Sequence, residues 1–285
     1  MISNTQFEKE LEIIVANALR EDIGDGDHSS LACIPEDAQG KAQLLVKDTG
    51  IIAGIAFAER VFQAVDSNLD VHCLMKEGTV VKPGDVVLTV SGSTQAILKA
   101  ERLVLNAVQR MSAIATKTHS YVALLEGTHT KILDTRKTTP GIRALEKWAV
   151  KIGGGVNHRF ALYDAIMLKD NHIDFAGGIS QAIQKTQAYL AATGNDLELI
   201  VEARNLEEVR EILRSDGVHR ILLDNFNYED TRKAVAMING KCQTESSGNI
   251  NEDTLRNYAQ CGVDFISSGA LTHSIYNMDL SLKAC

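Results

Sequence analysis

The sequence is poor in the features that mark disulfide-rich and membrane-spanning proteins. Among 285 residues there are five cysteines, and no two of them form a CxxC pair. The cysteines are Cys33, Cys73, Cys242, Cys261 and Cys285. Their odd number and wide spacing argue against a disulfide framework and against a structural zinc site. No apolar run reaches the roughly 18–20 residues that a membrane-spanning helix needs.

Basic charge is also in deficit. The formal net charge is -8, which disfavours nucleic acid as a partner because that ligand needs an extended basic face. The first residues, MISNTQFEKELEII, lack the basic start and apolar core of a signal peptide. Hydrophobic residues make up 45% of the chain, enough for a sizeable core. We therefore expect a soluble, cytoplasmic protein of one large domain or two ordinary ones, with neither membrane nor nucleic acid as partner.

The first hundred residues predict a mixed α/β domain. Apolar spacing predicts a helix over 5–20, and the following EDIGDGDHSS predicts a turn that stops it, because the spacing and closing glutamate of a calcium loop are absent. Residues 41–98 carry short β-rich runs separated by Gly, Pro and Asp, with a helix over 55–66. Within this region, EGTVVKPGDVVLTVSG predicts a hairpin that turns at Pro83-Gly84.

A long helical region over 99–126 bridges to a different pattern, with Leu103, Ala107 and Met111 on one face and Arg110 expected on the solvated surface. After Gly127, short apolar runs alternate with amphipathic helical stretches. The runs end at Asp134, Lys169, Glu202, Asp224, Glu245 and Ser268. Alternation of this kind predicts parallel βα units, and nearly all-apolar strands indicate a sheet buried on both faces. About six strands are clear, which favours an α/β barrel with fewer than eight strands. An open doubly wound sheet is the alternative, although no GxGxxG follows the first strand.

Cations gather between Lys131 and His172 against the acidic balance of the chain. They are Arg136, Lys137, Arg143, His158, Arg159 and Lys169. A mixed set of Arg, Lys and His suits a small molecule that carries more than one kind of anion. The glycines at 153–155 precede His158, and we expect them to bring backbone close to a ligand.

Further polar groups follow the later strands. Glu202 and Asp224 are carboxylates suited to Mg²⁺ or to ribose hydroxyls. The loops ESSGN (245–249) and SSGA (267–270) are small and contain glycine, so their backbone N–H groups are able to hold a phosphate. Taken singly, each residue has a structural alternative: a helix cap for either carboxylate, or an ion pair with a neighbouring aspartate for Lys169. Their coincidence at strand ends favours a site.

The stretch DTRKTTPGIRALEKWAVKIGGGVNHR, followed by YDAIMLKDNH, resembles the quinolinate phosphoribosyltransferase family, as do AERLVLN, LLDNF, ESSGNI and GVDFISSGALTHS. The resemblance implies an N-terminal α/β sandwich domain, which we place at 1–110. It implies a C-terminal incomplete α/β barrel at 111–285, with roughly the last fifteen residues packing back on the first domain. It also implies a homodimer in which each N-terminal domain covers the partner's barrel mouth.

The implied reaction joins quinolinate to 5-phosphoribosyl-1-pyrophosphate with Mg²⁺ as cofactor, and it yields nicotinate mononucleotide, pyrophosphate and CO₂ for de novo NAD synthesis. By this resemblance the quinolinate carboxylates are held by Arg136, His158 and Arg159, with Lys137 and Lys169 near them and near the pyrophosphate. Arg102 reaches in from the partner subunit. The residues expected to take part in catalysis are Lys137, Lys169, Glu202 and Asp224, of which Glu202 and Asp224 bind ribose hydroxyls or Mg²⁺. The 5-phosphate pocket is lined by Ser247, Gly248, Ser268 and Gly269.

Three residues depart from the family pattern. Ser246 and Asn249 stand in a phosphate loop that in the family reads more like EASGGI, and Arg204 adds a charge near the strand end. Asn tolerates left-handed backbone, so we expect the turn to survive. Two alternatives remain: a phosphoribosyltransferase that takes nicotinate or another pyridine, and a non-catalytic metabolite-binding relative on the same fold.

Overall fold

The computed structural model describes residues 3–285, which form two compact units. One unit, called here the sandwich unit, contains residues 3–119, 137–154 and 271–285. The other, called the barrel unit, contains residues 120–136 and 155–270. The predicted limits 1–110 and 111–285 divide the sequence once, whereas these units divide it at several positions.

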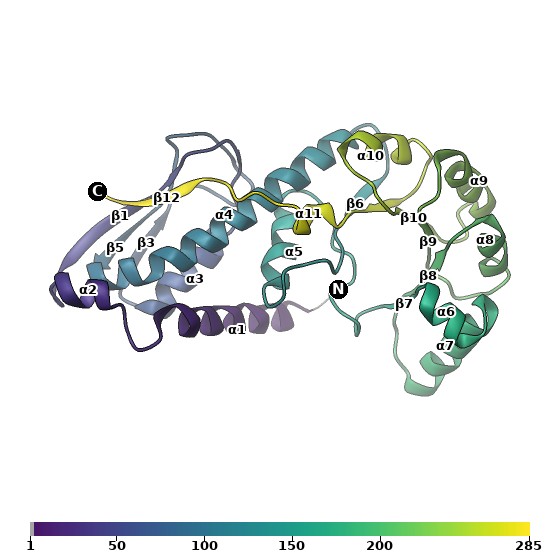
Figure 1. The fold of residues 1–285 in the computed structure, drawn as a ribbon, viewed down its shortest axis with the longest axis horizontal. Helices are drawn as coiled ribbons and strands as arrows, with labels where there is room; N and C mark the ends of the chain where they lie inside the picture. The colour runs from purple at the N-terminus through teal and green to yellow at the C-terminus, as the bar shows by residue number, and fades with distance from the viewer. Residues whose placement is uncertain (1–2) are drawn as a thin grey trace. The chain divides into compact units, whose positions relative to one another are not determined.

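The sandwich unit is built on a four-stranded sheet in the order β12-β1-β5-β3 (Figure 1). Its central strand β1 (Gln39–Val46) pairs antiparallel with β12 (Leu280–Ala284) on one side and with β5 (Val86–Ser93) on the other. Strand β3 (Asp70–Cys73) pairs with the far side of β5. The last strand of the chain therefore completes a sheet that the first strand begins.

The hairpin predicted across Pro83-Gly84 is wrong. A turn is present, with Gly84 at φ +95°, and Gly84 N donates a hydrogen bond to Val46 O at 2.9 Å. However, β4 (Val80–Val81) pairs with β2 (Gly50–Ile51), while β5 pairs with β1 and β3. The two strands that flank the turn belong to separate sheets, because each finds a partner elsewhere in the chain.

The predicted helices over 5–20, 55–66 and 99–126 are confirmed, with ends shifted by a few residues. The helices of this part of the chain are α1 (Asn4–Ile23), α2 (His28–Cys33), α3 (Ile55–Val65), α4 (Thr94–Leu124), α5 (Arg143–Ile152) and α11 (Ala270–His273). The EDIGDGD segment does stop α1, at Gly24 with φ +55°. It also begins α2, which the sequence pattern did not predict: Asp27 caps that helix by accepting a hydrogen bond from Ser30 N at 3.2 Å.

Helices α4 and α5 lie in direct contact at Gly153, which follows the last residue of α5. A Cβ on Gly153 would clash with the carbonyl oxygen of Ala115 and would lie 2.7 Å from Thr118 Cβ. The expectation that the glycine run brings backbone close to a ligand is therefore wrong for Gly153. Its missing side chain makes room for a helix instead.

The barrel unit holds a six-stranded sheet in the order β6-β11-β10-β9-β8-β7, and every ladder in it is parallel. The strands are β6 (Lys131–Leu133), β7 (Ile166–Leu168), β8 (Leu199–Ala203), β9 (Arg220–Asp224), β10 (Gln243–Ser247) and β11 (Phe265–Ser267). Within residues 3–285 no ladder joins β6 to β7, and Leu133 instead makes an isolated bridge to Val156. The unit is an incomplete α/β barrel, as predicted.

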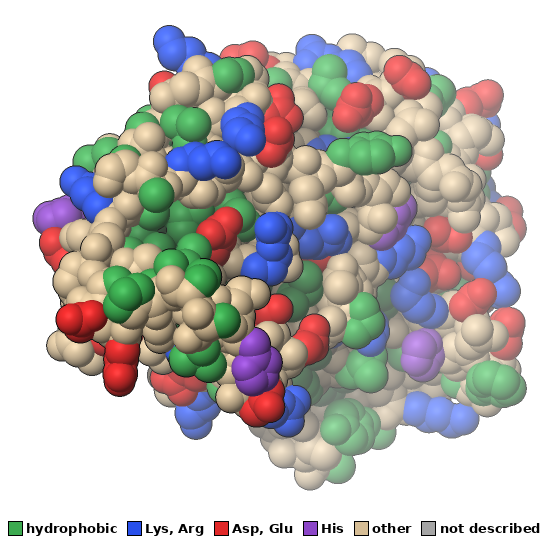
Figure 2. Space-filling view, turned by 60° about the vertical axis from the view of Figure 1, so that its left-hand side comes forward, with side chains coloured by type: hydrophobic (Ala, Val, Ile, Leu, Met, Phe, Trp, Pro, Cys, Tyr) green, Lys and Arg blue, Asp and Glu red, His purple; other side chains and the backbone are tan. Residues whose placement is uncertain are grey.

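Helices connect the strands and lie along their outer side in Figure 1. They are α6 (Asp170–Ala176), α7 (Ile179–Thr193), α8 (Leu206–Ile212), α9 (Tyr228–Ile238) and α10 (Glu252–Ala259). No helix of the described chain is long and apolar enough to cross a membrane. On the part of the surface drawn in Figure 2, lysine and arginine side chains are interspersed with aspartate and glutamate.

Strand register decides which side chains of the barrel unit share a face. Glu202 of β8 pairs with Leu222 of β9, and Leu222 pairs with Glu245 of β10. Asp224 pairs with Ser247 in the same ladder. Partners in a parallel ladder project to the same side, and alternate residues of one strand do so too. Glu202, Asp224, Glu245 and Ser247 therefore lie on one face, called here the site face.

Candidate active site

Lys169, Glu202 and Asp224 stand at the ends of three neighbouring strands, as the sequence predicts. Lys169 Nζ lies 3.3 Å from Glu202 Oε2, and the side chain of Glu202 is only 8% exposed while that of Lys169 is 49% exposed. Burial raises the pKa of Glu202, the charge of Lys169 lowers it, and the charge of Asp224 raises it further. A buried carboxylate beside a second one and a lysine is a setting that favours a bound cation or a polar ligand.

Asp224 is tied to the loops that follow β9 and β10. Ser247 Oγ donates to Asp224 Oδ1 at 2.9 Å, and Asn225 Nδ2 donates to Asp224 Oδ2 at 2.7 Å. Asn225 N donates to Ser247 O at 2.9 Å. Gly248, at φ +96°, leaves no room for a side chain, because a Cβ there would lie 2.9 Å from Asn225 N and clash with the Asn225 side chain. The two loops thus meet backbone to backbone, an arrangement suited to a phosphate.

The departures from the family pattern have structural explanations in part. Asn249 adopts φ 51° and its Nδ2 donates to Asn225 Oδ1 at 3.3 Å, so the left-handed turn survives as expected. Arg204 pairs with Glu208 at 2.8 Å and lies 3.5 Å from Asp174, which offsets its charge. Ser246 is 1% exposed, and its Oγ has no hydrogen-bond partner among the described residues.

The second small loop follows β11. Ser268 is 4% exposed, its N donates to Leu133 O at 3.0 Å, and its Oγ donates to Ile250 O at 3.2 Å. These bonds hold the start of the loop against β6 and against the segment after β10. Gly269, the next residue, stays a predicted phosphate contact.

His158 and Arg159 form a turn that is held by hydrogen bonds to the buried carboxylate of Asp134. Asp134 is fully buried, and its Oδ1 accepts a hydrogen bond from His158 N at 2.8 Å while its Oδ2 accepts one from Asn157 Nδ2 at 2.6 Å. His158 Nδ1 accepts from Arg159 N at 2.7 Å, and Arg159 Nη1 donates to Ala165 O at 3.0 Å. The turn and the Arg159 guanidinium are therefore positioned before any ligand arrives.

Arg136 and Arg159 are brought close enough to repel each other. The pKa of Arg159 is lowered, first by burial and then by the charge of Arg136, whereas Asp164 acts in the opposite direction. Asp164 itself accepts hydrogen bonds from Phe160 N at 2.7 Å and Ala161 N at 2.8 Å, so it mainly stabilises the loop over residues 160–164. Two guanidinium groups in repulsive proximity form a ready site for an anion with more than one negative charge.

Lys137 and Arg102 belong to the sandwich unit. Both are exposed, and the carbonyl of Lys137 accepts a hydrogen bond from Thr272 Oγ1 at 2.8 Å. The expectation that Arg110 is a solvated surface group is wrong. Arg110 Nε donates to Glu146 Oε1 at 2.7 Å, and Glu146, which lies on α5, is 1% exposed.

Glu245 is a site residue whose role the sequence did not reveal, because the pattern placed it at the end of a strand. The strand continues to Ser247, so Glu245 lies inside β10 and is fully buried. Its Oε2 lies 3.2 Å from His158 Nε2 and 3.0 Å from Arg220 Nη1. Burial acts to raise the pKa of Glu245, but the hydrogen bond and charge of His158 and the charge of Arg220 outweigh it and lower the pKa. The sequence did contain a signal for this role: a glutamate in a strand that is expected to be buried on both faces needs a charged partner.

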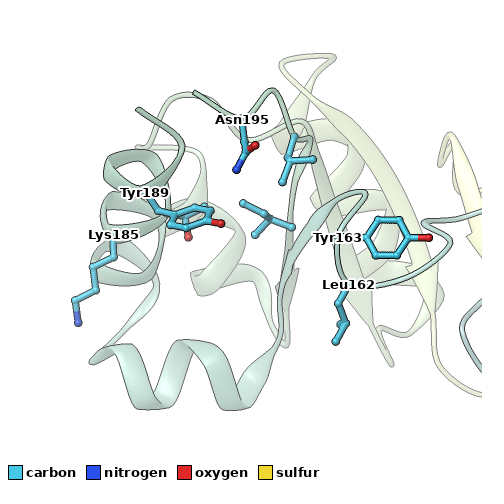
Figure 3. Close-up of a pocket in the computed structure, with 8 residues that line it drawn as sticks. Leu162, Tyr163, Lys185, Tyr189 and Asn195 are labelled. Carbon is cyan, nitrogen blue, oxygen red and sulfur yellow. The ribbon is translucent and has the colours of Figure 1, made fainter. Parts of the chain in front are cut away.

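A pocket elsewhere on the barrel unit is distinct from this site. It lies between α7 and the segment that precedes β7, and Figure 3 labels Leu162, Tyr163, Lys185, Tyr189 and Asn195 around it. None of its lining residues is a predicted site residue. With one cation, Lys185, the lining lacks the charges that a polyanion needs.

Within residues 3–285 no three His, Cys, Asp or Glu side chains gather into a metal cluster. Glu202 and Asp224 nevertheless fit a magnesium ion that is held largely by substrate phosphates, since that mode needs only one or two protein carboxylates. Burial is the main cause of the raised pKa of Glu202 and the charge of Asp224 adds to it, so a cation near the two carboxylates would reduce their repulsion.

Comparisons with known proteins agree with this arrangement over the whole chain. Residues 27–112 match the family model for the N-terminal domain of quinolinate phosphoribosyl transferase, and residues 114–283 match the model for its C-terminal domain. A nicotinate-nucleotide pyrophosphorylase (carboxylating) of rice is 43% identical, over 96% of this chain and 77% of that protein. A probable enzyme of the same name from Bacillus subtilis is 39% identical, over 96% of this chain and 93% of that protein.

Solved structures agree as well. The nicotinate-nucleotide pyrophosphorylase of Francisella tularensis superposes with a TM-score of 0.90 at 36% identity, covering 100% of this chain and 98% of that one. Family models that cover both parts of the chain, close relatives and a shared fold all lead to one assignment. The chain belongs to the quinolinate phosphoribosyltransferase family.

Proposed function

We propose that this chain transfers the phosphoribosyl group of 5-phosphoribosyl-1-pyrophosphate to quinolinate with decarboxylation, and that the strand-end residues of the barrel unit carry the reaction. The products are nicotinate mononucleotide, pyrophosphate and CO₂, a step of de novo NAD biosynthesis. The observation that carries the choice of quinolinate is the pair of arginines at this end of the barrel, Arg136 and Arg159, whose charges act on each other, because two guanidinium groups exceed what a single carboxylate needs.

The chain's own residues mainly orient the substrates and stabilise charge. As pyrophosphate leaves, the ribose becomes positively charged at its anomeric carbon, and the carboxylates of Glu202 and Asp224 stabilise that charge. Lys169, whose Nζ lies 3.3 Å from Glu202 Oε2, offsets the negative charge of the substrates. The phosphate end is held at Ser247 and Gly248.

Loss of CO₂ follows from the adduct itself. The C–C bond to the carboxylate next to the ring nitrogen breaks, its electron pair stays on the ring carbon beside the new N⁺, and a proton then takes its place. The arginines hold the second carboxylate while this happens. Here the protein supplies orientation and exclusion of water, and no general acid with an unusual pKa is required.

Magnesium and the dimer are further parts of the proposal. Bound near Glu202 and Asp224, Mg²⁺ would neutralise the departing pyrophosphate. We propose a homodimer in which Arg102 of the partner subunit completes the quinolinate site. The free state of all five cysteines supports the proposed cytoplasmic location.

The test is an assay with Mg²⁺, 5-phosphoribosyl-1-pyrophosphate and either quinolinate or nicotinate, following CO₂ and mononucleotide. Turnover with quinolinate alone and equal release of CO₂ is the expected result. Turnover with nicotinate would assign the chain to the single-carboxylate alternative, and no turnover in a folded protein would favour a non-catalytic relative.

Calorimetry then separates the two half-sites. Arg136→Ala and Arg159→Ala should each weaken quinolinate binding more than binding of 5-phosphoribosyl-1-pyrophosphate. Arg210→Ala is the matched control, since Arg210 is an exposed arginine that pairs with Glu207 on α8. Mixing Arg102→Ala subunits with Lys169→Ala subunits should restore part of the activity if the site is shared, and no recovery would contradict the proposed role of Arg102.

A further inference from the structure

The His158-Arg159 turn rests on two carboxylates that no solvent reaches. Asp134 and Glu245 are both 0% exposed; Asp134 directly follows β6, whereas Glu245 lies within β10. Asp134 holds the main-chain N of His158 at 2.8 Å. Glu245 faces the imidazole, with 3.2 Å between its Oε2 and His158 Nε2. Burying two ionised groups is costly, so their placement here asks for a functional reason.

The hydrogen bonds fix the position of the imidazole proton. Since His158 Nδ1 accepts from Arg159 N at 2.7 Å, the ring proton resides on Nε2, the nitrogen that faces Glu245. The same acceptor nitrogen restrains the backbone at Arg159. The His158 ring therefore links Glu245 to the backbone of Arg159, whose guanidinium is proposed to bind quinolinate.

Glu245 is in turn held in place from the opposite side. Arg220 Nη1 lies 3.0 Å from Glu245 Oε2, and Arg220 Nη2 donates to Gln243 Oε1 at 3.1 Å. The guanidinium carbon of Arg220 lies 4.2 Å from the centroid of the Phe265 ring. The stacked and hydrogen-bonded Arg220 therefore holds Glu245 Oε2 from the side opposite His158.

Strand β10 connects this support to the phosphate loop. Glu245 and Ser247 lie on the same strand and the same face, and Ser247 is the residue that bonds Asp224 at 2.9 Å. The position of the quinolinate arginine and the position of the phosphate loop are thereby set from one rigid element. Such a link matters because the ring nitrogen and the anomeric carbon must meet in a defined geometry.

We infer that Glu245 is a positioning residue for quinolinate: it fixes the orientation of the His158 ring, and through His158 the Arg159 backbone, without touching substrate. This inference rests on the proposed function. It predicts that loss of the Glu245 carboxylate impairs the quinolinate half-site and spares the half-site for 5-phosphoribosyl-1-pyrophosphate.

The main variant is Glu245→Gln, which keeps the shape and removes the charge. The double variant Arg220→Gln with Glu245→Gln removes both charges of the buried pair, and it serves if the single variant fails to fold. Thr244→Val is the matched control. Thr244 is the neighbouring buried residue on the other face of β10, where it bonds Asp264 at 2.8 Å.

Calorimetry with each substrate gives the first readout. We expect Glu245→Gln to raise the quinolinate Kd about tenfold, which corresponds to about 1.4 kcal/mol, with the Kd for 5-phosphoribosyl-1-pyrophosphate changed less than about twofold. Nitrogen NMR of the His158 ring, assigned with a His158→Gln variant, gives the second. The wild type should show a single Nε2–H tautomer, and Glu245→Gln should shift the Nε2 resonance because the carboxylate beside it is lost.

Unchanged quinolinate binding in Glu245→Gln would overturn the inference, and so would equal weakening of both substrates, because that pattern reports general structural damage. If the wild-type protein does not bind quinolinate at all, the proposed function fails instead. The nitrogen spectra would then still show whether the Glu245 carboxylate contacts the His158 ring.

Discussion

Ser247 Oγ lies 2.9 Å from Asp224 Oδ1 and donates a hydrogen bond to it, so the proposed phosphate loop and the proposed ribose carboxylate are one connected structure. The second oxygen of Asp224 accepts from Asn225 Nδ2 at 2.7 Å. The carboxylate is therefore oriented by the loops it connects, and its removal should affect chemistry more than folding.

Asp224→Asn tests this directly. The amide keeps the shape and one acceptor oxygen, but it loses the negative charge that stabilises the ribose cation. We expect kcat to fall by roughly 100-fold or more, of the order seen when one transition-state contact is removed, with an unchanged unfolding midpoint. Asp196→Asn, an exposed aspartate outside the site, is the control. A wild-type kcat in Asp224→Asn would rule out the assigned role.

Gly248→Ala should damage the phosphate loop. The backbone there has φ +96°, and the new methyl group would meet Asn225, whose backbone N would lie 2.9 Å from it. We expect the KM for 5-phosphoribosyl-1-pyrophosphate to rise and stability to drop by about 1–3 kcal/mol. Gly240→Ala is a close control, because Gly240 has φ +73° with nothing within 4 Å. If the two variants behave alike, left-handed backbone strain alone explains the effect and the contact with Asn225 is unimportant.

The raised pKa of Glu202 makes a prediction about stability and pH. Burial, the largest cause, favours the protonated carboxyl in the folded state, so the folded protein binds more protons than the unfolded chain does. The ordinary value for glutamate is 4.5, and stability should therefore fall as pH rises from below 4.5 through the raised pKa of the folded state. Urea unfolding of Glu202→Gln should show a weaker fall over this interval than the wild type, together with loss of turnover. Identical pH profiles would mean that burial of Glu202 has no energetic cost.

Ser246→Ala should stabilise the protein. The hydroxyl is buried without a hydrogen-bond partner among the described residues, so its removal relieves a desolvation cost of about 1–3 kcal/mol. Thermal unfolding of the ligand-free protein measures this gain. Ser247→Ala, one residue along the same strand, removes a hydroxyl that does bond and should not stabilise. A loss of stability in Ser246→Ala would reveal a partner for the hydroxyl in solution.

The barrel unit was predictable because each strand is a short apolar run closed by a polar residue. Asp134, Lys169, Glu202 and Asp224 were all recognised at or just beyond a strand end on that pattern. Such a pattern can be read from a few neighbouring residues. The C-terminal ends of parallel strands lie at one edge of the sheet, independently of the helices that connect them. The sequence could not reveal which of these ends form a contact, such as the pair of Lys169 and Glu202.

The predictions that are wrong concern strands and side chains whose partners are distant in the sequence. The strands around Pro83-Gly84 have the turn chemistry of a hairpin, yet each pairs with a strand some distance away in sequence. Arg110 has the pattern of a surface residue on a long helix, but α5 places Glu146 against it. The pattern predicts Glu245 at a strand end because a charged residue is not expected inside a buried strand. In the structure His158 and Arg220 lie beside Glu245 and compensate its charge.

The pairing of β12 with β1 has a consequence for biosynthesis. Leu44 faces Leu282 in that ladder, so the sheet of the sandwich unit gains strand β12 only after residues 280–284 have been synthesised. All segments of the barrel unit are translated earlier, within residues 120–270. Until β12 is synthesised, the edge of β1 that it covers carries unpaired N–H and C=O groups, which are open to wrong strand pairing.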